Sequence, residues 1–253
     1  MTIIQTEVEQ GLKQLGLGKG DKVLVHSSMK SLGYIEGGAD AVINAFLNIL
    51  GEEGAFIVPT LTGKFTDSPS CPPNFNVTES KCWTGKIPET ARCRAEARRS
   101  LHPTHSVSVI GSLKEELTGQ HEKGSSPCDE YSPYYKNCIG GGYILLIGVD
   151  QESNTTIHCC EEIAGVPYHL QKTSTEVRFQ GYENNEIVVR NYLHDWYKPA
   201  TDFMYLEPFL EEKKVIRTAR IGDSCIRLIN AYGMLEETVK LLRKDPEFLI
   251  RKV

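Results

Sequence analysis

The segment Asn154-Thr155-Thr156-Ile157-His158-Cys159-Cys160-Glu161-Glu162 combines an imidazole with two carboxylates at a spacing that could support acid–base chemistry. If the chain is helical from Thr155 onward, Glu161 and Glu162 lie three and four residues beyond His158 and share its helix face. A neighbouring carboxylate orients an imidazole and raises its basicity, which suits a general base that removes a proton from an amine. An ordinary His–Glu pair on a helix surface is the alternative interpretation.

The cysteines are a second source of reactivity, because Cys159 directly follows His158. Adjacent residues of a helix point about 100° apart, so His158 is poorly aimed to deprotonate Cys159. The eight cysteines of the chain include no CxxC pair that would indicate a zinc site or a redox centre. We expect reduced thiols, and a cysteine-dependent hydrolase using Cys159 or Cys160 is a less favoured alternative.

A hydroxyl-rich segment, VHSSMKSLG at residues 25–33, follows an apolar stretch. The hydroxyls of Ser27 and Ser28 and the neighbouring backbone N–H groups could donate hydrogen bonds to a phosphate or a carbonyl. The segment matches neither a Walker A loop nor a GxGxxG fingerprint. A plain helix N-cap is therefore the simpler interpretation of the segment on its own.

A third segment, RRSLHPTHS at residues 98–106, holds two arginines and two histidines. Planar guanidinium groups can bind an anionic phosphate through two hydrogen bonds at once. The spacing of His102 and His105 could suggest a metal site, but Pro103 disfavours a regular helix between them and no third ligand lies at a recognisable spacing. We expect no metal ion.

The elements that would position these segments alternate between strands and helices. Apolar stretches predict strands at residues 22–26, 55–59 and 143–149, and helical spacing predicts helices at 39–50 and 155–164. A strand, a helix and a strand in succession predict a parallel pair. The continuous apolarity of 143–149 is typical of a central strand covered on both faces.

The second half of the chain has a different pattern. Residues 62–86 are polar and rich in proline, which indicates a long ordered loop over a site or a flexible lid. Short alternating runs at 175–179 and 186–190 predict a hairpin, and the tail from 226 to 250 is helical in character. We therefore predict an α/β fold with a mostly parallel central sheet flanked by helices, with an added β-hairpin and helices in the C-terminal half. The chain would form a single domain, with a core of about residues 1–168 and an acceptor-side region of about 169–253.

The overall composition narrows the class of protein. The 253 residues carry a formal net charge of −5, which argues against a nucleic-acid binder and leaves room for a cationic small-molecule substrate. Neither an apolar stretch of membrane-spanning length nor a secretory signal pattern is apparent, so we expect a cytoplasmic protein without a membrane partner.

In combination, the motifs are similar to those of the antibiotic N-acetyltransferase family typified by aminoglycoside 3-N-acetyltransferases. The matching pieces are VHSSMKSLG (25–33), GGADAVINAFLNILGEEGAFIVPTLT (37–62), TGKIPE (84–89), RRSLHPTHSVSVIG (98–111), HEKGSSP (121–127), GGYILLIGV (141–149) and NTTIHCCEEIAGVPY (154–168). This resemblance implies an enzyme that transfers the acetyl group of acetyl-CoA directly to a primary amine of an aminoglycoside, as a monomer or homodimer.

The resemblance also assigns roles to particular residues. It implies that His158 is the general base and that Glu161, rather than Glu162, is its carboxylate partner. The cofactor groove would be lined by Ser27, Ser28, Leu32, Arg99, His102 and Ser106, and the acceptor by Asp67, Glu161 and Asp195, with Asp202 as a further candidate. The loop at 63–83 and the stretch 191–197 depart from the aminoglycoside-resistance pattern. A different amine acceptor therefore stays open as an alternative.

Overall fold

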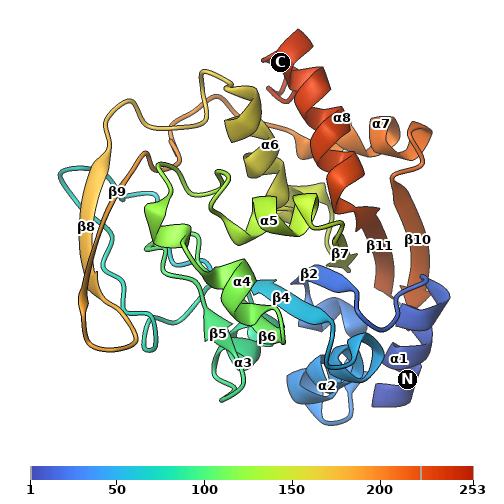
Figure 1. Ribbon diagram of the computed structural model, residues 1–253. Coiled ribbons are helices and arrows are strands. Elements are labelled where there is room, and N and C mark those ends of the chain that lie inside the picture. The colour runs from blue at the N-terminus through green and yellow to red at the C-terminus, as the bar shows by residue number, and fades with distance from the viewer. Residues whose placement is uncertain (1, 223, 253) are drawn as a thin grey trace.

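The computed structural model describes residues 2–222 and 224–252 and is built on a seven-stranded mixed sheet with helices packed on both faces (Figure 1). The strand order is β10-β11-β7-β2-β4-β6-β5. The strands of this sheet are β2 (Lys22–Ser27), β4 (Ala55–Pro59), β5 (Arg98–Arg99), β6 (Val107–Gly111), β7 (Tyr143–Ile147), β10 (Ile216–Ile221) and β11 (Ser224–Asn230).

The helices that cover the sheet are short, and several of them connect its strands. The α-helices are α1 (Gln5–Gln14), α2 (Gly38–Leu50), α3 (Lys86–Arg92), α4 (Lys114–Thr118), α5 (Pro133–Ile139), α6 (Thr156–Ala164), α7 (Leu206–Glu212) and α8 (Ala231–Lys244). Single 3₁₀ turns occur at η1 (Met29–Leu32), η2 (His121–Lys123), η3 (Gln151–Ser153) and η4 (Phe203–Tyr205). None of the helices in the described part of the chain is long and apolar enough to cross a membrane.

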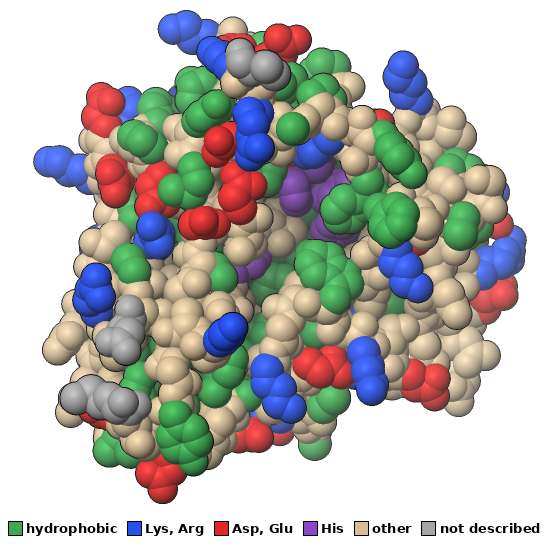
Figure 2. Space-filling view, turned by 180° about the vertical axis from the view of Figure 1, so that it is seen from behind, with side chains coloured by type: hydrophobic (Ala, Val, Ile, Leu, Met, Phe, Trp, Pro, Cys, Tyr) green, Lys and Arg blue, Asp and Glu red, His purple; other side chains and the backbone are tan. Residues whose placement is uncertain are grey.

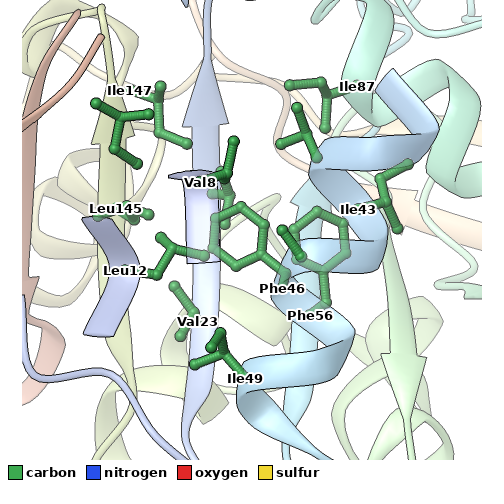
Figure 3. Close-up of a cluster of buried hydrophobic side chains, with 14 of the residues drawn as sticks. Val8, Leu12, Val23, Ile43, Phe46, Ile49, Phe56, Ile87, Leu145 and Ile147 are labelled. Atoms are coloured by element: carbon green, nitrogen blue, oxygen red, sulfur yellow. The ribbon is translucent and has the colours of Figure 1, made fainter. Parts of the chain in front are cut away.

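The central strands are apolar on both faces because each face packs against its own layer of helices. Side chains alternate along a strand, so Val23 and Val25 of β2 enter the core beneath α1 and α2, whereas Leu24 enters the core beneath α5, α6 and α8. Figure 3 shows the first of these cores, in which Phe46 of α2 packs on Phe56 of β4 with ring centroids 4.9 Å apart.

The predicted parallel pairing applies to the three central strands. β2 pairs in parallel with β4 on one side and with β7 on the other, and the connection through α2 forms the predicted strand–helix–strand unit. The outer pairings, β4–β6, β5–β6, β7–β11 and β10–β11, are antiparallel. The fold class is as predicted, but "mostly parallel" describes only the centre of the sheet. Strand β6 is antiparallel to β4 because residues 60–106 bring the chain back to the end of the sheet at which β4 stops.

The polar loop at 62–86 packs against the predicted hairpin rather than projecting into solvent. The hairpin consists of β8 (Thr175–Gln180) and β9 (Glu186–Asn191), and it stands apart from the main sheet (Figure 1). Phe75 and Val77 of the loop join Val177, Phe179 and Val189 in a small apolar cluster. A further pair of two-residue strands, β1 (Thr2–Ile3) and β3 (Tyr34–Ile35), pairs in parallel beside α1 and α2.

Candidate active site

The imidazole of His158 and the carboxylate of Glu161 meet at the start of α6, three residues apart as the spacing predicts. Asn154 sets the beginning of this helix, since its Oδ1 accepts a hydrogen bond from the backbone N–H of Thr156. Nδ1 of His158 lies 2.7 Å from Oε2 of Glu161. Glu161 is fully buried, whereas the side chain of His158 is 21% exposed. A ring nitrogen held in this way leaves Nε2 as the only nitrogen free to exchange a proton.

Glu161 is surrounded by groups that favour its ionised form. Besides His158, Nδ1 of His169 lies 3.2 Å from its Oε2, and Nζ of Lys198 lies 3.7 Å from its Oε1. Burial by itself would raise the pKa of Glu161, but His169, His158 and Lys198 outweigh burial and lower it to about 2. Glu161 is therefore a carboxylate at neutral pH.

Glu162, the adjacent carboxyl, points away from His158 into a different environment. Its oxygens accept hydrogen bonds from Oγ of Ser126 at 2.6 Å and from the backbone N–H of Cys128 at 3.0 Å, and Nε2 of His194 lies 3.1 Å from Oε1. Burial raises the pKa of Glu162 to about 8. The structure thus separates the two glutamates that the sequence places on one helix face.

All seven histidines of the chain lie in or around one buried region, although they are scattered along the sequence. The ring of His158 lies 4.7 Å from that of His169 and 4.6 Å from that of His194, and the rings of His169 and His194 are 4.0 Å apart, all between centroids. The ring of His105 lies 4.1 Å from that of His194. Figure 2 shows histidine side chains at the bottom of a hollow in the surface.

Burial keeps these imidazoles neutral. It lowers the pKa of His26 to about 3 and lowers the pKa values of His105, His169 and His194 well below the ordinary value. It also lowers the pKa of His158, although the hydrogen bond to Glu161 acts in the opposite direction. A neutral imidazole beside a carboxylate can accept a proton at physiological pH.

His158 opens into a cavity of about 360 Å³ at the edge of the sheet where the parallel strands end. This is the switch point of the sheet, because the chain leaves β2 towards β4 on one side and returns in β7 on the other. The cavity is lined by Val25, His26, Ser27, Pro59, Leu61, Trp83, Thr84, Pro88, His105, Val149, Glu152, Ser153, Asn154, Thr155, His158 and Trp196. Among the lining residues that the structure describes, Glu152 is the only carboxylate.

The sequence model of the aminoglycoside 3-N-acetyltransferase family matches residues 24–243, which include the whole of this site. The chain belongs to the aminoglycoside 3-N-acetyltransferase family. The SPbeta prophage-derived aminoglycoside N(3')-acetyltransferase-like protein YokD of Bacillus subtilis (strain 168) is 36% identical over 174 residues, which are 61% of this chain and 63% of that protein. Aminoglycoside N(3)-acetyltransferase VII of Streptomyces paromomycinus is 31% identical over 65% of this chain and 62% of that enzyme. These alignments span less than two thirds of the length of either relative.

Solved structures of family members have the same fold over nearly the whole chain. The crystal structure of aminoglycoside acetyltransferase AAC(3)-Xa superimposes with a TM-score of 0.84 at 24% identity, covering 99% of this chain and 95% of that one. The YokD crystal structure gives a TM-score of 0.82 at 25% identity, covering 98% of this chain and 96% of that one. A binary complex of AAC-IIIb with CoASH gives 0.83 at 22% identity and covers all of both chains.

Arg99 was predicted to line the cofactor groove. In this fold it is a buried side chain that hydrogen-bonds to the protein's own backbone. Its side chain is buried, and its N–H groups donate to the carbonyl oxygens of Thr60, Val77 and Ser80 and to Oγ of Ser106. Burial lowers its pKa to about 10. These bonds tie the loop at 62–86 to the edge of the sheet and leave Arg99 unavailable to a phosphate.

His102 and Ser106, from the same segment, are also absent from the cavity wall. His102 is fully buried, and its Nδ1 accepts a hydrogen bond from the backbone N–H of His105. Oγ of Ser106 donates to the carbonyl oxygen of Thr60. His105, the other histidine of the segment, is the one that reaches the cavity.

The hydroxyl segment is divided between the site and the scaffold. Ser27 lines the cavity, and its buried Oγ has no hydrogen-bond partner among the described residues. Oγ of Ser28 accepts from the backbone N–H of Ser31, which is the N-cap alternative of the sequence analysis. Leu32 is buried in the core beneath α1 and α2 and does not face the cavity.

The three aspartates considered for the acceptor site stabilise turns. Oδ2 of Asp67 accepts from the backbone N–H of Lys64, Oδ1 of Asp195 from that of Tyr197, and Oδ1 of Asp202 from that of Met204. None of them lines the cavity, although Trp196 beside Asp195 does.

Sequence reasoning missed Glu152, His169, His194 and Lys198. Glu152 could have been found, because it follows the central strand β7 by five residues and the ends of such strands carry binding groups. Nothing in the sequence predicted that His169, His194 and Lys198 reach Glu161 and Glu162, because these contacts depend on the path of the chain around the hairpin.

Proposed function

We propose that the protein is an acetyl-CoA-dependent N-acetyltransferase in which His158 is the general base. The observation that carries the proposal is the hydrogen bond between Nδ1 of His158 and the buried carboxylate of Glu161, on a helix that begins at the wall of the cavity. The carboxylate fixes the tautomer in which Nε2 carries a lone pair, and it stabilises the imidazolium that forms when Nε2 accepts a proton.

The transfer is direct. The amine nitrogen attacks the thioester carbonyl carbon, Nε2 of His158 takes the proton that the amine loses, and the carbon–sulfur bond breaks to release the thiol of CoA after protonation. The thioester supplies an activated acetyl group, and Oγ of Ser27, which has no partner among the described residues, is a donor available to the carbonyl oxygen as it becomes negative.

A cysteine nucleophile is not supported by the geometry. The side chains of Cys159 and Cys160 are fully buried in the core beneath α5, α6 and α8. Burial raises the pKa of both thiols well above the ordinary value, so neither forms a thiolate at neutral pH. The cysteine-dependent hydrolase considered from the sequence therefore receives no support.

We propose an aminoglycoside as the acceptor, with another cationic amine as the alternative. Glu152, Trp83 and Trp196 line the cavity, and carboxylates and indole rings attract ammonium ions. Oε1 of Glu152 also accepts a hydrogen bond from the backbone N–H of Phe203. Acidic side chains also lie along one side of the hollow that contains the histidines (Figure 2). The structure of AAC-VIa bound to sisomicin, which has a TM-score of 0.82 to this chain, supports an acceptor of this class.

The test is release of free thiol from acetyl-CoA in the presence of a panel of aminoglycosides and simple diamines, with a chelator in every reaction. His158→Ala should lose at least about 100-fold in kcat, the lower end of the contribution of a general base. Cys159→Ala, on the same helix, is the matched control and should retain activity. Turnover that survives in His158→Ala would remove His158 from its role, and CoA binding without transfer to any aminoglycoside would favour the alternative acceptor.

A further inference from the structure

Three of the clustered histidines, His158, His169 and His194, have the arrangement of a site for a transition-metal ion. Each offers one ring nitrogen, and these nitrogens all lie within 4.8 Å of one another. A tetrahedral Zn²⁺ ion with Zn–N distances of about 2.05 Å holds its ligand nitrogens about 3.4 Å apart. The nitrogens would have to approach one another to about this distance to bind such an ion.

The carboxylate of Glu161 hydrogen-bonds to the ring of His158 and lies beside the ring of His169. Its Oε2 lies 2.7 Å from Nδ1 of His158 and 3.2 Å from Nδ1 of His169. Histidines that ligate metals commonly donate one N–H to a carboxylate and bind the ion through the other nitrogen. The hydrogen bond from Nδ1 of His158 to Glu161 leaves its Nε2 with a lone pair. Nδ1 of His169 lies 3.2 Å from Oε2 of Glu161 and 3.3 Å from Nζ of Lys198, and Nε2 of His169 is a ligand in the tautomer that holds the proton on Nδ1, facing Glu161.

The Nε2 atom of His169 is free of competing hydrogen bonds in the described part of the chain, and Oε1 of Glu162 lies 3.7 Å from it. The side chain of His169 is only 1% exposed, and its Nε2 has no hydrogen-bond partner among the described residues. A buried nitrogen without a partner costs free energy, so such atoms are rare in native proteins. A metal ion would satisfy it.

A second grouping of donors, Cys128, Glu162 and His194, is less suited to a metal ion. The oxygens of Glu162 already accept hydrogen bonds from Oγ of Ser126 and the backbone N–H of Cys128. Cys128 is fully buried, whereas His158 lines the open cavity and gives an ion a path from solvent. The histidine triad is therefore the better site.

We propose that His158, His169 and His194 bind a divalent transition-metal ion such as Zn²⁺, and that bound metal inhibits acetyl transfer. Neutral imidazoles suit Zn²⁺, and the fourth position would face the cavity and hold water. Lys198 is the nearest cation, and the ionised carboxylate of Glu161 offsets its charge. The inhibition rests on the proposed function, because the metal occupies the lone pair of His158 that would accept the proton from the amine, but metal binding does not depend on that function.

The first experiment measures binding alone. Chelator-treated protein is titrated with Co²⁺ as a spectroscopic probe of tetrahedral coordination and with Zn²⁺ in a calorimeter. We expect one ion per chain, and at least tenfold weaker binding in His169→Gln and in His194→Gln, with the fold of each variant checked by circular dichroism. Cys128→Ser is the matched control and should bind as tightly as the wild type.

Three results would overturn the site: no tetrahedral Co²⁺ spectrum in the wild type, unchanged binding in both glutamine variants, or loss of binding in Cys128→Ser. The second experiment measures acetyl transfer with added Zn²⁺ and then with excess chelator, and inhibition reversed by the chelator supports the proposal. If Co²⁺ binds through His169 but no transfer occurs even with chelator, the proposed function fails and the site stands. If transfer occurs and is insensitive to Zn²⁺, the inhibitory role fails.

Discussion

Replacing Glu161 by glutamine tests the centre of the proposed mechanism while keeping the size and shape of the side chain. The carboxylate of Glu161 lies 2.7 Å from Nδ1 of His158. The substitution removes its negative charge from beside the base. A hydrogen bond to a charged group contributes about 1.5–3 kcal/mol. Because each 1.36 kcal/mol is a factor of ten in rate, kcat should fall roughly 10- to 150-fold.

The loss becomes larger if the new amide donates its N–H to Nδ1 of His158. The imidazole would then hold its proton on Nε2, the tautomer that cannot act as a base, and a comparable change in a catalytic triad costs about 10⁴-fold. Either outcome acts on kcat, and KM for acetyl-CoA should change little because Glu161 is fully buried behind His158.

Glu162→Gln is the matched control, because the same chemical change is made one residue away. The raised pKa of Glu162, about 8, means that this carboxyl is mostly neutral at pH 7, and the amide keeps acceptor and donor positions for its neighbours. Its kcat should stay within a few-fold of the wild type. Steady-state thiol release in chelated buffer measures all three proteins, and a Glu161→Gln enzyme with wild-type kcat would refute the reasoning.

Three further substitutions test the scaffold and the cavity. Arg99→Met leaves the carbonyls of Val77 and Ser80 without the donor that Arg99 supplies, so limited proteolysis should cleave the loop at 62–86 at least tenfold faster than in the wild type. Gly148→Ala puts a side chain at φ +60° against Ser31, which should cost about 2–4 kcal/mol and lower Tm by roughly 5–10 °C in a thermal melt. Trp196→Ala removes one aromatic wall of the cavity and should raise the acceptor KM about two- to fivefold in the thiol-release assay, with kcat little changed.

The sequence was sufficient to predict the centre of the fold. The strand at 22–26, the helix at 39–50 and the strand at 55–59 became β2, α2 and β4 with ends shifted by at most one residue. The helical repeat identifies the helix, and the short length of the apolar runs and the glycines beside them identify the strands. The tail was only half predicted. Residues 224–230 form strand β11 before α8 begins, and the alternation there was hidden by the apolar residues that follow.

The site was predictable only where its contacts are local. The pairing of His158 with Glu161 follows from a spacing of three residues on a helix, so the sequence contains it. Arg99 is an example of a residue whose contacts are not local. The sequence does not distinguish an arginine that binds a phosphate from one that binds three backbone carbonyls. Its partners lie 19 to 39 residues away in the chain, and only the folded path of the loop brings them to it.

The proposed base and the proposed metal site depend on the same atom, Nε2 of His158, and the residues around it affect the two roles differently. Burial favours the neutral imidazole, which both roles require, and the carboxylate of Glu161 strengthens the donor in both. Proton transfer uses this pair directly, with His169 acting only through the charge of Glu161. Stable metal binding needs His169 and His194 as ligands, because one imidazole holds Zn²⁺ weakly. Replacing His169 or His194 should therefore reduce inhibition by Zn²⁺ more than it reduces kcat. Equal reductions in inhibition and in kcat would mean that these histidines support His158 as a base and do not bind the metal.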